Sequence, residues 1–244
     1  MSKENDAIQY SRAIHCNNLT HLGITDLDTF LRISKEDWNL RAGHDASSYV
    51  CASPRASEEQ IRASGKGDVI REFIPRINGY KSDVIVELGA GFGRMTMFIA
   101  PFCKKLYAID ISGDLLFQAK QRLSGSVYQH VEFIETDGMH LNTVPDNSVD
   151  LCYSYIVFQH IVAAEIVVSY IHEACRVLKV GGVFVFHGRD VNGVTDVTLG
   201  NTWHGFRLGS NFVRDAIQTT SFKIIKEEGQ NTDRYWCTLK KEDN

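Results

Sequence analysis

The stretch that decides the fold is VIVELGAGFGRMT, residues 84–96. An apolar run leads into three closely spaced glycines, Gly89, Gly91 and Gly93, and a helical pattern follows them. Glycines let the backbone turn sharply and approach a ligand, and the next helix offers free N–H groups and its positive dipole end. The stretch predicts a buried strand, a tight turn and a helix, with a ligand across the turn. A glycine-rich turn without a ligand is the alternative.

Downstream of this stretch, short apolar runs alternate with helical patterns. The expected strands are 84–89, 105–110, 131–136, 148–158 (a strand that runs into a loop), 180–188, 222–229 and 234–241, and the expected helices are 93–103, 113–123, 165–178 and 210–220. This alternation is typical of a doubly wound, mostly parallel sheet between two helix layers, an α/β three-layer sandwich. The short turn GQNTD, residues 229–233, joins the last two strands. Strands joined in this way are antiparallel.

Upstream, a helix is expected to begin at Ser57, because Ser57 and Gln60 have the spacing of a capping box. Residues 1–56 show no clear strand. Residues 19–34 suggest one short helix, and residues 38–57 suggest an irregular segment. We therefore expect a small N-terminal cap at 1–56 and one α/β domain at 57–244.

The spacing of the glycines bears on the ligand. The dinucleotide fingerprint is Gly-x-Gly-x-x-Gly, whereas here Arg94 occupies the position of the third glycine. Glu87, two residues before the first glycine, would repel a pyrophosphate but would attract a cationic ligand. A sulfonium that also carries an ammonium group fits this acid, so Glu87 indicates S-adenosylmethionine as the cofactor.

Two further acidic residues follow expected strands. Asp110 ends the strand 105–110, about 20 residues beyond the glycine loop, where a carboxylate can accept hydrogen bonds from a ribose diol. Asp110 could instead cap the next helix together with Ser112. Asp137 follows the strand 131–136 and could meet an adenine amine, with Met139 on the ring face. The alternative for Asp137 and Gly138 is an ordinary Asp-Gly turn.

The ordered segments resemble the motifs of class I, Rossmann-like S-adenosylmethionine-dependent methyltransferases, especially the small-molecule branch (methyltransferase type 11/12-like). They are ELGAGFGR (87–94), AIDIS (108–112), ETDGMHL (135–141), PDNSVDLCYSYIVFQHI (145–161) and EACRVLKVGGVFVF (173–186). The resemblance covers about residues 57–190 and continues more weakly through the last two strands. It implies a seven-stranded sheet whose last strand is antiparallel.

The resemblance also implies roles for individual residues. Glu87 would lie near the methionine amino group, Asp110 would bind the ribose hydroxyls, and Asp137 with Gly138 would flank the adenine. The expected cofactor-binding residues are Glu87, Gly89, Ala90, Gly91, Arg94, Asp110, Ile111, Asp137, Gly138, Met139 and Tyr155.

The segment 153–160, where the fourth expected strand runs into a loop, should open beside the sulfonium. His160 is the candidate general base, because histidine changes charge near neutral pH. A structural His160, capping a helix or bonding a carbonyl, is the alternative. Tyr155 and Phe158 could wall the pocket. His187 and Arg189, at the next strand end, could touch the substrate or lie in solvent.

Selection of the methyl acceptor is expected to fall to the N-terminal cap and to residues 192–211. Both contain aromatic and small polar residues, which suit a concave apolar pocket with a few polar anchors. The aromatic and histidine residues concerned are Trp38, Tyr49, Trp203, His204 and Phe206. Packing of the cap onto the sheet is the alternative, and it is favoured for Trp38.

The composition of the chain narrows the classes of protein to which it can belong. With 43% hydrophobic residues in 244, the chain can bury a full core, and its net charge of −4 offers no overall basic surface for nucleic acid. Six scattered cysteines suggest neither a disulfide framework nor a zinc site, and no metal is expected. The N-terminus lacks an apolar signal core, and no run approaches a membrane span. We therefore expect a cytoplasmic protein without a nucleic-acid or membrane partner.

The sequence thus predicts an enzyme that transfers a methyl group from S-adenosylmethionine to an oxygen or nitrogen of a small-molecule acceptor. One alternative is a non-catalytic protein that binds S-adenosylmethionine or S-adenosylhomocysteine. The other is an NAD(P)-dependent reductase, which Arg94 and the lack of a Tyr-x-x-x-Lys pair after the fourth strand disfavour. The acceptor, the methylated atom and the oligomeric state do not follow from the sequence.

Overall fold

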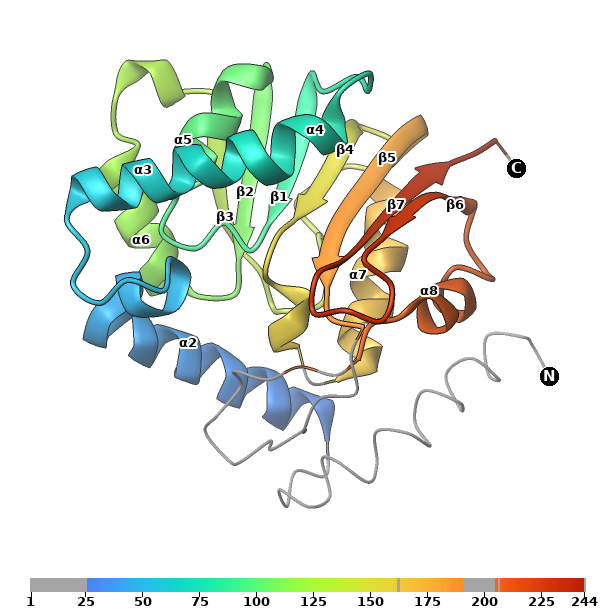
Figure 1. Ribbon diagram of the computed structural model, residues 1–244, viewed down its shortest axis with the longest axis horizontal. Helices are drawn as coiled ribbons and strands as arrows, with labels where there is room; N and C mark the ends of the chain where they lie inside the picture. The colour runs from blue at the N-terminus through green and yellow to red at the C-terminus, as the bar shows by residue number, and fades with distance from the viewer. Residues whose placement is uncertain (1–25, 162, 191–204, 206, 244) are drawn as a thin grey trace.

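The computed structural model describes residues 26–161, 163–190, 205 and 207–243. A seven-stranded sheet with the order β3-β2-β1-β4-β5-β7-β6 forms its centre (Figure 1). The strands are β1 (Val84–Leu88), β2 (Lys105–Asp110), β3 (Val131–Glu135), β4 (Val149–Ser154), β5 (Leu178–Gly188), β6 (Phe222–Glu228) and β7 (Tyr235–Lys241).

The first five strands are parallel, and β7 pairs antiparallel with both β5 and β6. The predicted doubly wound sheet and its antiparallel last strand are confirmed. Because the strand order reverses between β1 and β4, the carboxyl ends of these strands flank a crevice, which is where open α/β sheets bind ligands.

Helices cover both faces of the sheet (Figure 1). The described helices and short helical turns are α2 (Leu27–Val50), α3 (Glu58–Asp68), the π-helix η1 (Val69–Phe73), α4 (Ile74–Ile77), α5 (Thr96–Ile99), η2 (Ala100–Phe102), α6 (Gly113–Arg122), η3 (Ser126–Tyr128), η4 (Phe158–His160), α7 (Ala164–Val177) and α8 (Ser210–Ala216). The predicted capping box of α3 is present, with Ser57 Oγ accepting from Gln60 N and Gln60 Oε1 accepting from Ser57 N.

The strands supply alternate residues to two cores, as the period of two requires. Ile85, Leu151 and Val183 pack with residues of η1 and α5 on one face. Val86, Cys152 and Phe184 face α7 on the other. Successive residues of β1, β4 and β5 therefore point to opposite faces of the sheet, and a residue's place in this alternation decides which face its side chain occupies.

The expected irregular segment at 38–57 is wrong, because α2 continues to Val50. Its alternation of small, polar and aromatic residues gives almost no amphipathic signal, so tertiary contacts stabilise the helix instead. Asn39 Oδ1 accepts from Ser112 Oγ at 2.6 Å, and Gln118 Nε2 donates to Ala42 O at 3.1 Å. A non-helical residue, Asp45, interrupts the helix.

The position of α2 matters for the site. In Figure 1 the helix runs along the carboxyl ends of the strands, in blue at the bottom of the view. Its residues Phe30, Trp38 and Val50 line the cleft described below. The division into a cap at 1–56 and a domain at 57–244 stays a prediction.

Candidate active site

The glycine loop between β1 and α5 turns through left-handed backbone. Gly89, Gly91 and Gly93 have φ values of +76°, +55° and +83°, which other residues adopt only with strain. A Cβ at Gly89 would overlap the side chain of Val157. The N–H groups of Gly89 and Ala90 donate to Ile109 O at 2.8 and 3.0 Å. The loop is therefore tied to the end of β2 in one conformation.

Asp110 lies at the end of β2 and completes this turn. Its Oδ2 accepts from Gly91 N at 2.8 Å, and its Oδ1 accepts from Ser112 N at 2.9 Å. Ser112 itself is the N-cap of α6, so the capping role proposed for Asp110 belongs to Ser112. Burial raises the pKa of Asp110 above its ordinary value. Asp110 thus places a carboxylate beside the glycine loop.

Glu87 is the most unusual group in the site. It lies in β1, is 4% exposed, and its Oε2 has no hydrogen-bond partner within the described part of the chain. Burial raises the pKa of this carboxyl to about 7, against the opposing influence of the Thr96 hydroxyl and of Arg94. A buried carboxyl without a partner is costly unless a ligand completes it, and a cationic group would do so.

One cleft of about 1,220 Å³, including its open part, brings the candidate residues together. Of the predicted cofactor-binding residues, nine line it: Glu87, Gly89, Ala90, Gly91, Arg94, Asp110, Ile111, Gly138 and Tyr155. The candidate base His160 lines it too. These residues come from the ends of β1, β2, β3 and β4, so the parallel sheet has assembled them.

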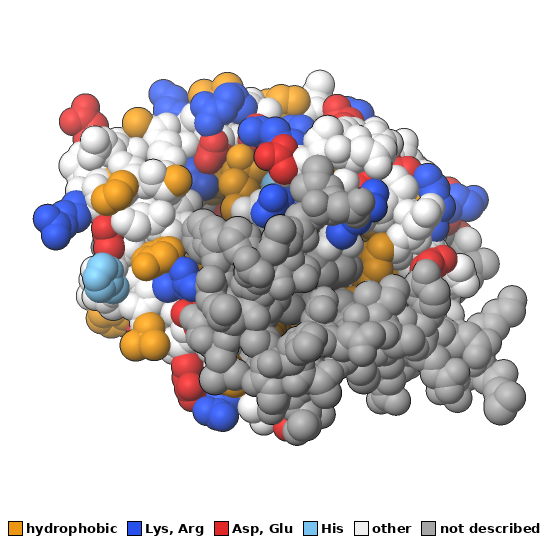
Figure 2. Space-filling model, turned by 60° about the horizontal axis from the view of Figure 1, so that its bottom comes forward, with side chains coloured by type: hydrophobic (Ala, Val, Ile, Leu, Met, Phe, Trp, Pro, Cys, Tyr) orange, Lys and Arg blue, Asp and Glu red, His pale blue; other side chains and the backbone are white. Residues whose placement is uncertain are grey.

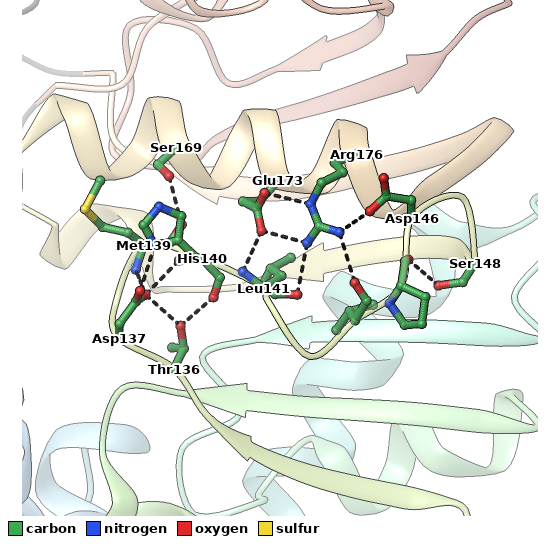
Figure 3. Close-up of polar contacts among 12 residues, drawn as sticks. Thr136, Asp137, Met139, His140, Leu141, Asp146, Ser148, Ser169, Glu173 and Arg176 are labelled. Carbon is green, nitrogen blue, oxygen red and sulfur yellow. Dashed lines mark hydrogen bonds and ion pairs between the residues drawn. The ribbon is translucent and has the colours of Figure 1, made fainter.

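Asp137 and Met139 are not among the residues that line this cleft. Asp137 Oδ1 accepts from the N–H groups of Met139 and His140, both at 2.8 Å, and Oδ2 lies 2.6 Å from His140 Nδ1 (Figure 3). These contacts support the alternative of a turn-forming Asp137. The contact of Asp137 with adenine stays a prediction. Gly138, next to Ile111 and Leu31, does line the cleft.

The sequence did not predict the clamp that holds the loop after β3 against α7 (Figure 3). Arg176 donates to Leu141 O at 3.0 Å and to Val144 O at 3.1 Å. Glu173 Oε2 accepts from Leu141 N at 2.7 Å and pairs with Arg176 at 2.8 Å. The clamp orders the chain that leads from Gly138 to β4. An acid and a base three residues apart on a helix were its only sequence signal.

Arg94 lines the cleft, but its guanidinium already has protein partners. It pairs with Asp68 of α3 and donates to Ser64 Oγ at 3.2 Å. Gly65 permits this close approach, because a Cβ there would overlap the carbonyl of Arg94. The geometry favours a role for Arg94 in packing α3 on the loop, and direct cofactor contact stays a prediction.

His160 is 7% exposed and lies in η4. The edge of its ring packs against Trp38 at 5.6 Å between centroids, and Nε2 lies 3.1 Å from Gln159 Nε2. The N–H of Gly205 donates to Gln159 O at 2.5 Å, so this residue of the expected acceptor-selecting segment lies against η4. Residues 191–204 and 206, with Trp203, His204 and Phe206, lie outside the described residues.

Several lining residues were missed by the sequence interpretation. They are Phe30, Ser34 and Val50 of α2, and Ile166 and Tyr170 of α7. Their signals were weak because α2 lacks a clear apolar stripe, and because apolar residues of α7 look alike whether they face a core or a cleft. Of the candidates at the end of β5, His187 is 4% exposed and Arg189 is half-buried.

The described surface adds three negative observations. On the face in Figure 2, basic and acidic side chains are interspersed around the rim, so the described residues there form no continuous basic patch. The described residues contain no group of three His, Cys, Asp or Glu side chains that could hold a metal ion. Among the helices placed by the structure, none has the length and apolarity needed to cross a membrane.

The fold and the site define a class I, Rossmann-like domain whose cleft presents a glycine loop, a buried acid in β1 and an acid at the end of β2. Solved structures share this architecture. Magnesium protoporphyrin IX methyltransferase from Synechocystis, with bound SAM, aligns with a TM-score of 0.62 at 13% identity over 89% of this chain and 99% of that one. The N-methyltransferase NodS from Bradyrhizobium japonicum, with SAH, gives 0.61 at 16% identity over 85% and 100%.

A third structure is a complex of the Haloferax volcanii Trm112 methyltransferase activator with a methyltransferase, with a TM-score of 0.60, 14% identity, and coverage of 84% and 98%. At this identity, the likeness shows the fold alone.

Relatives found by sequence match a shorter part of this chain than the solved structures do. A Methanocaldococcus jannaschii protein described as a "probable cobalt-precorrin-6B C(15)-methyltransferase (decarboxylating)" is 39% identical over 71 residues, 28% of this chain and 39% of that protein. The Archaeoglobus fulgidus protein of the same description is 34% identical over 73 residues, 30% and 42%. The chain spans about two fifths of the length of these relatives.

Residues 86–186 match the family model described as a methyltransferase domain. This part of the chain is therefore similar to methyltransferase domains, and the chain has the fold of the class I S-adenosylmethionine-dependent methyltransferases. The resemblance to that class inferred from the motifs is confirmed, and the small-molecule branch stays a prediction.

Proposed function

We propose that the protein is an enzyme that transfers a methyl group from S-adenosylmethionine to an oxygen or nitrogen of a small-molecule acceptor. The observation that carries the choice of cofactor is the buried, unpartnered Oε2 of Glu87 beside the glycine loop. An ammonium group placed there would supply both the missing hydrogen bond and the missing countercharge.

The residues of the cleft fit the other parts of this cofactor. Asp110, at the end of β2, would offer its carboxylate to the ribose hydroxyls, and Gly89, Ala90 and Gly91 of the glycine loop line the same cleft. Gly138 and Ile111 both line the cleft and would present an apolar surface to a flat base. When bound, the cofactor supplies an activated methyl group on a sulfonium.

The protein's own contribution to the reaction is orientation and removal of a proton. Tyr155 and His160 lie in the cleft at the end of β4, on the side away from Gly138. His160 would accept a proton from the acceptor, and Tyr155 would wall the acceptor's position. The mostly apolar lining around them, with Phe30, Trp38 and Ile156, suits a small molecule and excludes water.

The first experiment is calorimetric titration of the protein with S-adenosylmethionine, S-adenosylhomocysteine and NADH in parallel. We expect the first two to bind and NADH to give no heat of binding. NADH binding alone would favour the reductase. Binding of the first two without turnover of any acceptor in a broad screen would favour the non-catalytic binding protein.

Asp110→Ala is expected to weaken S-adenosylhomocysteine binding by about 1–3 kcal/mol, because it removes a charged acceptor from the ribose. 5′-Methylthioadenosine, which has the ribose but lacks the amino acid, should lose affinity to the same extent. Calorimetry with both ligands tests this role. Unchanged affinity in a folded Asp110→Ala variant would exclude the ribose contact.

Glu87→Gln is expected to change stability and binding in opposite directions. The folded pKa of Glu87, about 7, exceeds an unfolded value near 4.5, so the carboxyl destabilises the ligand-free fold increasingly as the pH rises between these values. At pH 8 the variant should be more stable than the wild type by about 1–3 kcal/mol, and at pH 4 this difference should vanish. Urea unfolding at both pH values measures it.

The same variant should bind S-adenosylhomocysteine about tenfold or more weakly, since the ammonium loses its countercharge. Its affinity for 5′-methylthioadenosine should not change. Equal pH dependence of stability in both proteins, or equal loss for both ligands, would contradict the role assigned to Glu87.

A further inference from the structure

Unpaired polar atoms gather on one face of the sheet, next to the proposed cofactor site. Tyr153 Oη, His187 Nδ1 and Trp236 Nε1 are enclosed and have no hydrogen-bond partner in the described residues. Their side chains are 1%, 4% and 3% exposed. A folded protein leaves few buried polar atoms unpaired, so three in one place indicate a site that a ligand completes.

The strand register explains why these atoms are neighbours. Glu87 pairs with Tyr153 across β1 and β4, and His187 pairs with Trp236 across β5 and β7. All four side chains are on the same sheet face, towards the carboxyl ends. The unpaired atoms therefore continue, strand by strand, from the acid that we assign to the cofactor.

Tyr155 separates this row from the open cleft. Its ring stacks on Trp236 at 5.5 Å with 7° between the planes, and it meets the edge of His187 at 5.5 Å. Tyr153 and Tyr155 both line the cleft, whereas His187 and Trp236 lie directly behind Tyr155. Movement of this one ring would expose the row to a ligand in the cleft.

The backbone next to Tyr155 is strained. Ile156 has a φ of +57°, a left-handed conformation that β-branched residues rarely adopt. Its side chain is 37% exposed and lines the cleft. Strain of this kind persists where the surroundings impose it and clusters at ligand sites. Release of this strain would favour a conformational change of the segment that carries Tyr155.

The row is electrically neutral. Burial, with Arg234 and Arg76 nearby, lowers the pKa of His187 to about 4, so the imidazole is uncharged at neutral pH. The two arginines are themselves engaged by Glu72, Arg234 at 2.6 Å and Arg76 at 3.0 Å. A charged ligand would lose its hydration here and would meet arginines whose charge Glu72 already balances.

We propose that Tyr153, Tyr155 and His187 form the acceptor subsite, and that it takes an uncharged aromatic molecule that carries a hydroxyl group. This inference rests on the proposed function. A phenolic hydroxyl both donates and accepts, so it could anchor the acceptor by pairing with His187 Nδ1 and Tyr153 Oη, while the proton that His160 would accept belongs to the methylated group. The rings of Tyr155 and Trp38, both in the cleft lining, provide aromatic walls for its ring.

The test uses the full chain saturated with S-adenosylhomocysteine and the probe 4-methylphenol, with 4-methylbenzoate and 4-methylbenzylammonium as charged analogues. NMR titration of the histidine side-chain nitrogens and of the probe gives dissociation constants without any turnover. We expect millimolar binding of 4-methylphenol, with a shift of the His187 signals, and at least about tenfold weaker binding of both charged analogues.

Tyr153→Phe is the sharpest variant, because it removes only an unpaired hydroxyl and keeps the ring that packs against Phe73. It should weaken 4-methylphenol binding about fivefold to tenfold and leave S-adenosylhomocysteine affinity and stability undiminished. The control is Tyr128→Phe in η3, at the opposite end of the strands, which should change neither ligand.

The outcomes separate the two proposals. If S-adenosylhomocysteine binds but 4-methylphenol does not, or if the charged analogues bind equally well, the subsite is overturned and the proposed function stands. Unchanged phenol binding by Tyr153→Phe also overturns it. If S-adenosylhomocysteine fails to bind the wild-type protein, the proposed function fails and the acceptor subsite fails with it.

Discussion

Gly89→Ala is expected to destabilise the protein by about 2–5 kcal/mol and to abolish measurable cofactor binding. Gly89 has a φ of +76°, which costs an alanine roughly 1–2 kcal/mol. The new Cβ would also overlap the side chain of Val157, and overpacking of this kind costs about 1–3 kcal/mol. Relief of the overlap would shift the glycine loop or the segment after β4, both of which line the cleft. Urea unfolding and titration with S-adenosylhomocysteine measure the two effects.

Gly43→Ala is the matched control. Gly43 lies inside α2, has no positive φ, and a Cβ there would meet nothing within 4 Å. Since alanine favours a helix over glycine, this variant should be as stable as the wild type or more stable by up to about 1 kcal/mol. If both variants lost similar stability, the special geometry assigned to Gly89 would be wrong.

His160→Ala is expected to cut turnover by ~100-fold or more while leaving cofactor affinity nearly unchanged, because a positioned base contributes about this factor to proton transfer. His160 lies in the cleft after β4, whereas the proposed cofactor contacts lie on β1, β2 and the loop after β3. Steady-state kinetics with an acceptor found by screening, and calorimetry with S-adenosylhomocysteine, are the two measurements.

The ring of His160 also packs against Trp38, so a structural loss must be separated from a catalytic one. His172→Ala serves as the control, since His172 lies on α7, and its Nε2 is 3.1 Å from Ala216 O. It should lower stability without affecting turnover. Full activity in a folded His160→Ala variant would assign His160 to structure alone.

The sequence predicted the elements of the domain well because each has a local cause. The apolar run of β1, the glycines after it and the capping box at Ser57 are each encoded within a few residues. The antiparallel β6–β7 pair followed from the short turn between its strands. Glu87 and Asp110 were predicted as cofactor contacts from their positions beside the glycine loop and at a strand end; both line the cleft, and the contacts stay predictions.

The cap was predicted poorly for the opposite reason. Residues 38–50 lack a helical apolar stripe, and α2 is stabilised by partners such as Ser112 and Gln118, which lie more than 70 residues away in the chain. Asp137 shows the same limit within the domain. Its carboxylate could serve a turn or a ligand, and only the contacts with Met139 and His140 favour the turn.

The sequence by itself determined the α/β class, the order of the strands along the chain, the glycine loop and the two acids that flank it. These features depend on local pattern and on the rule that parallel strands bring their carboxyl ends to one edge of the sheet. The tertiary structure alone decided that α2 covers this edge, and that Glu87 Oε2 and the row of Tyr153, His187 and Trp236 atoms have no hydrogen-bond partner among the described residues. Burial and hydrogen bonding join residues far apart in the chain, so no local pattern encodes them.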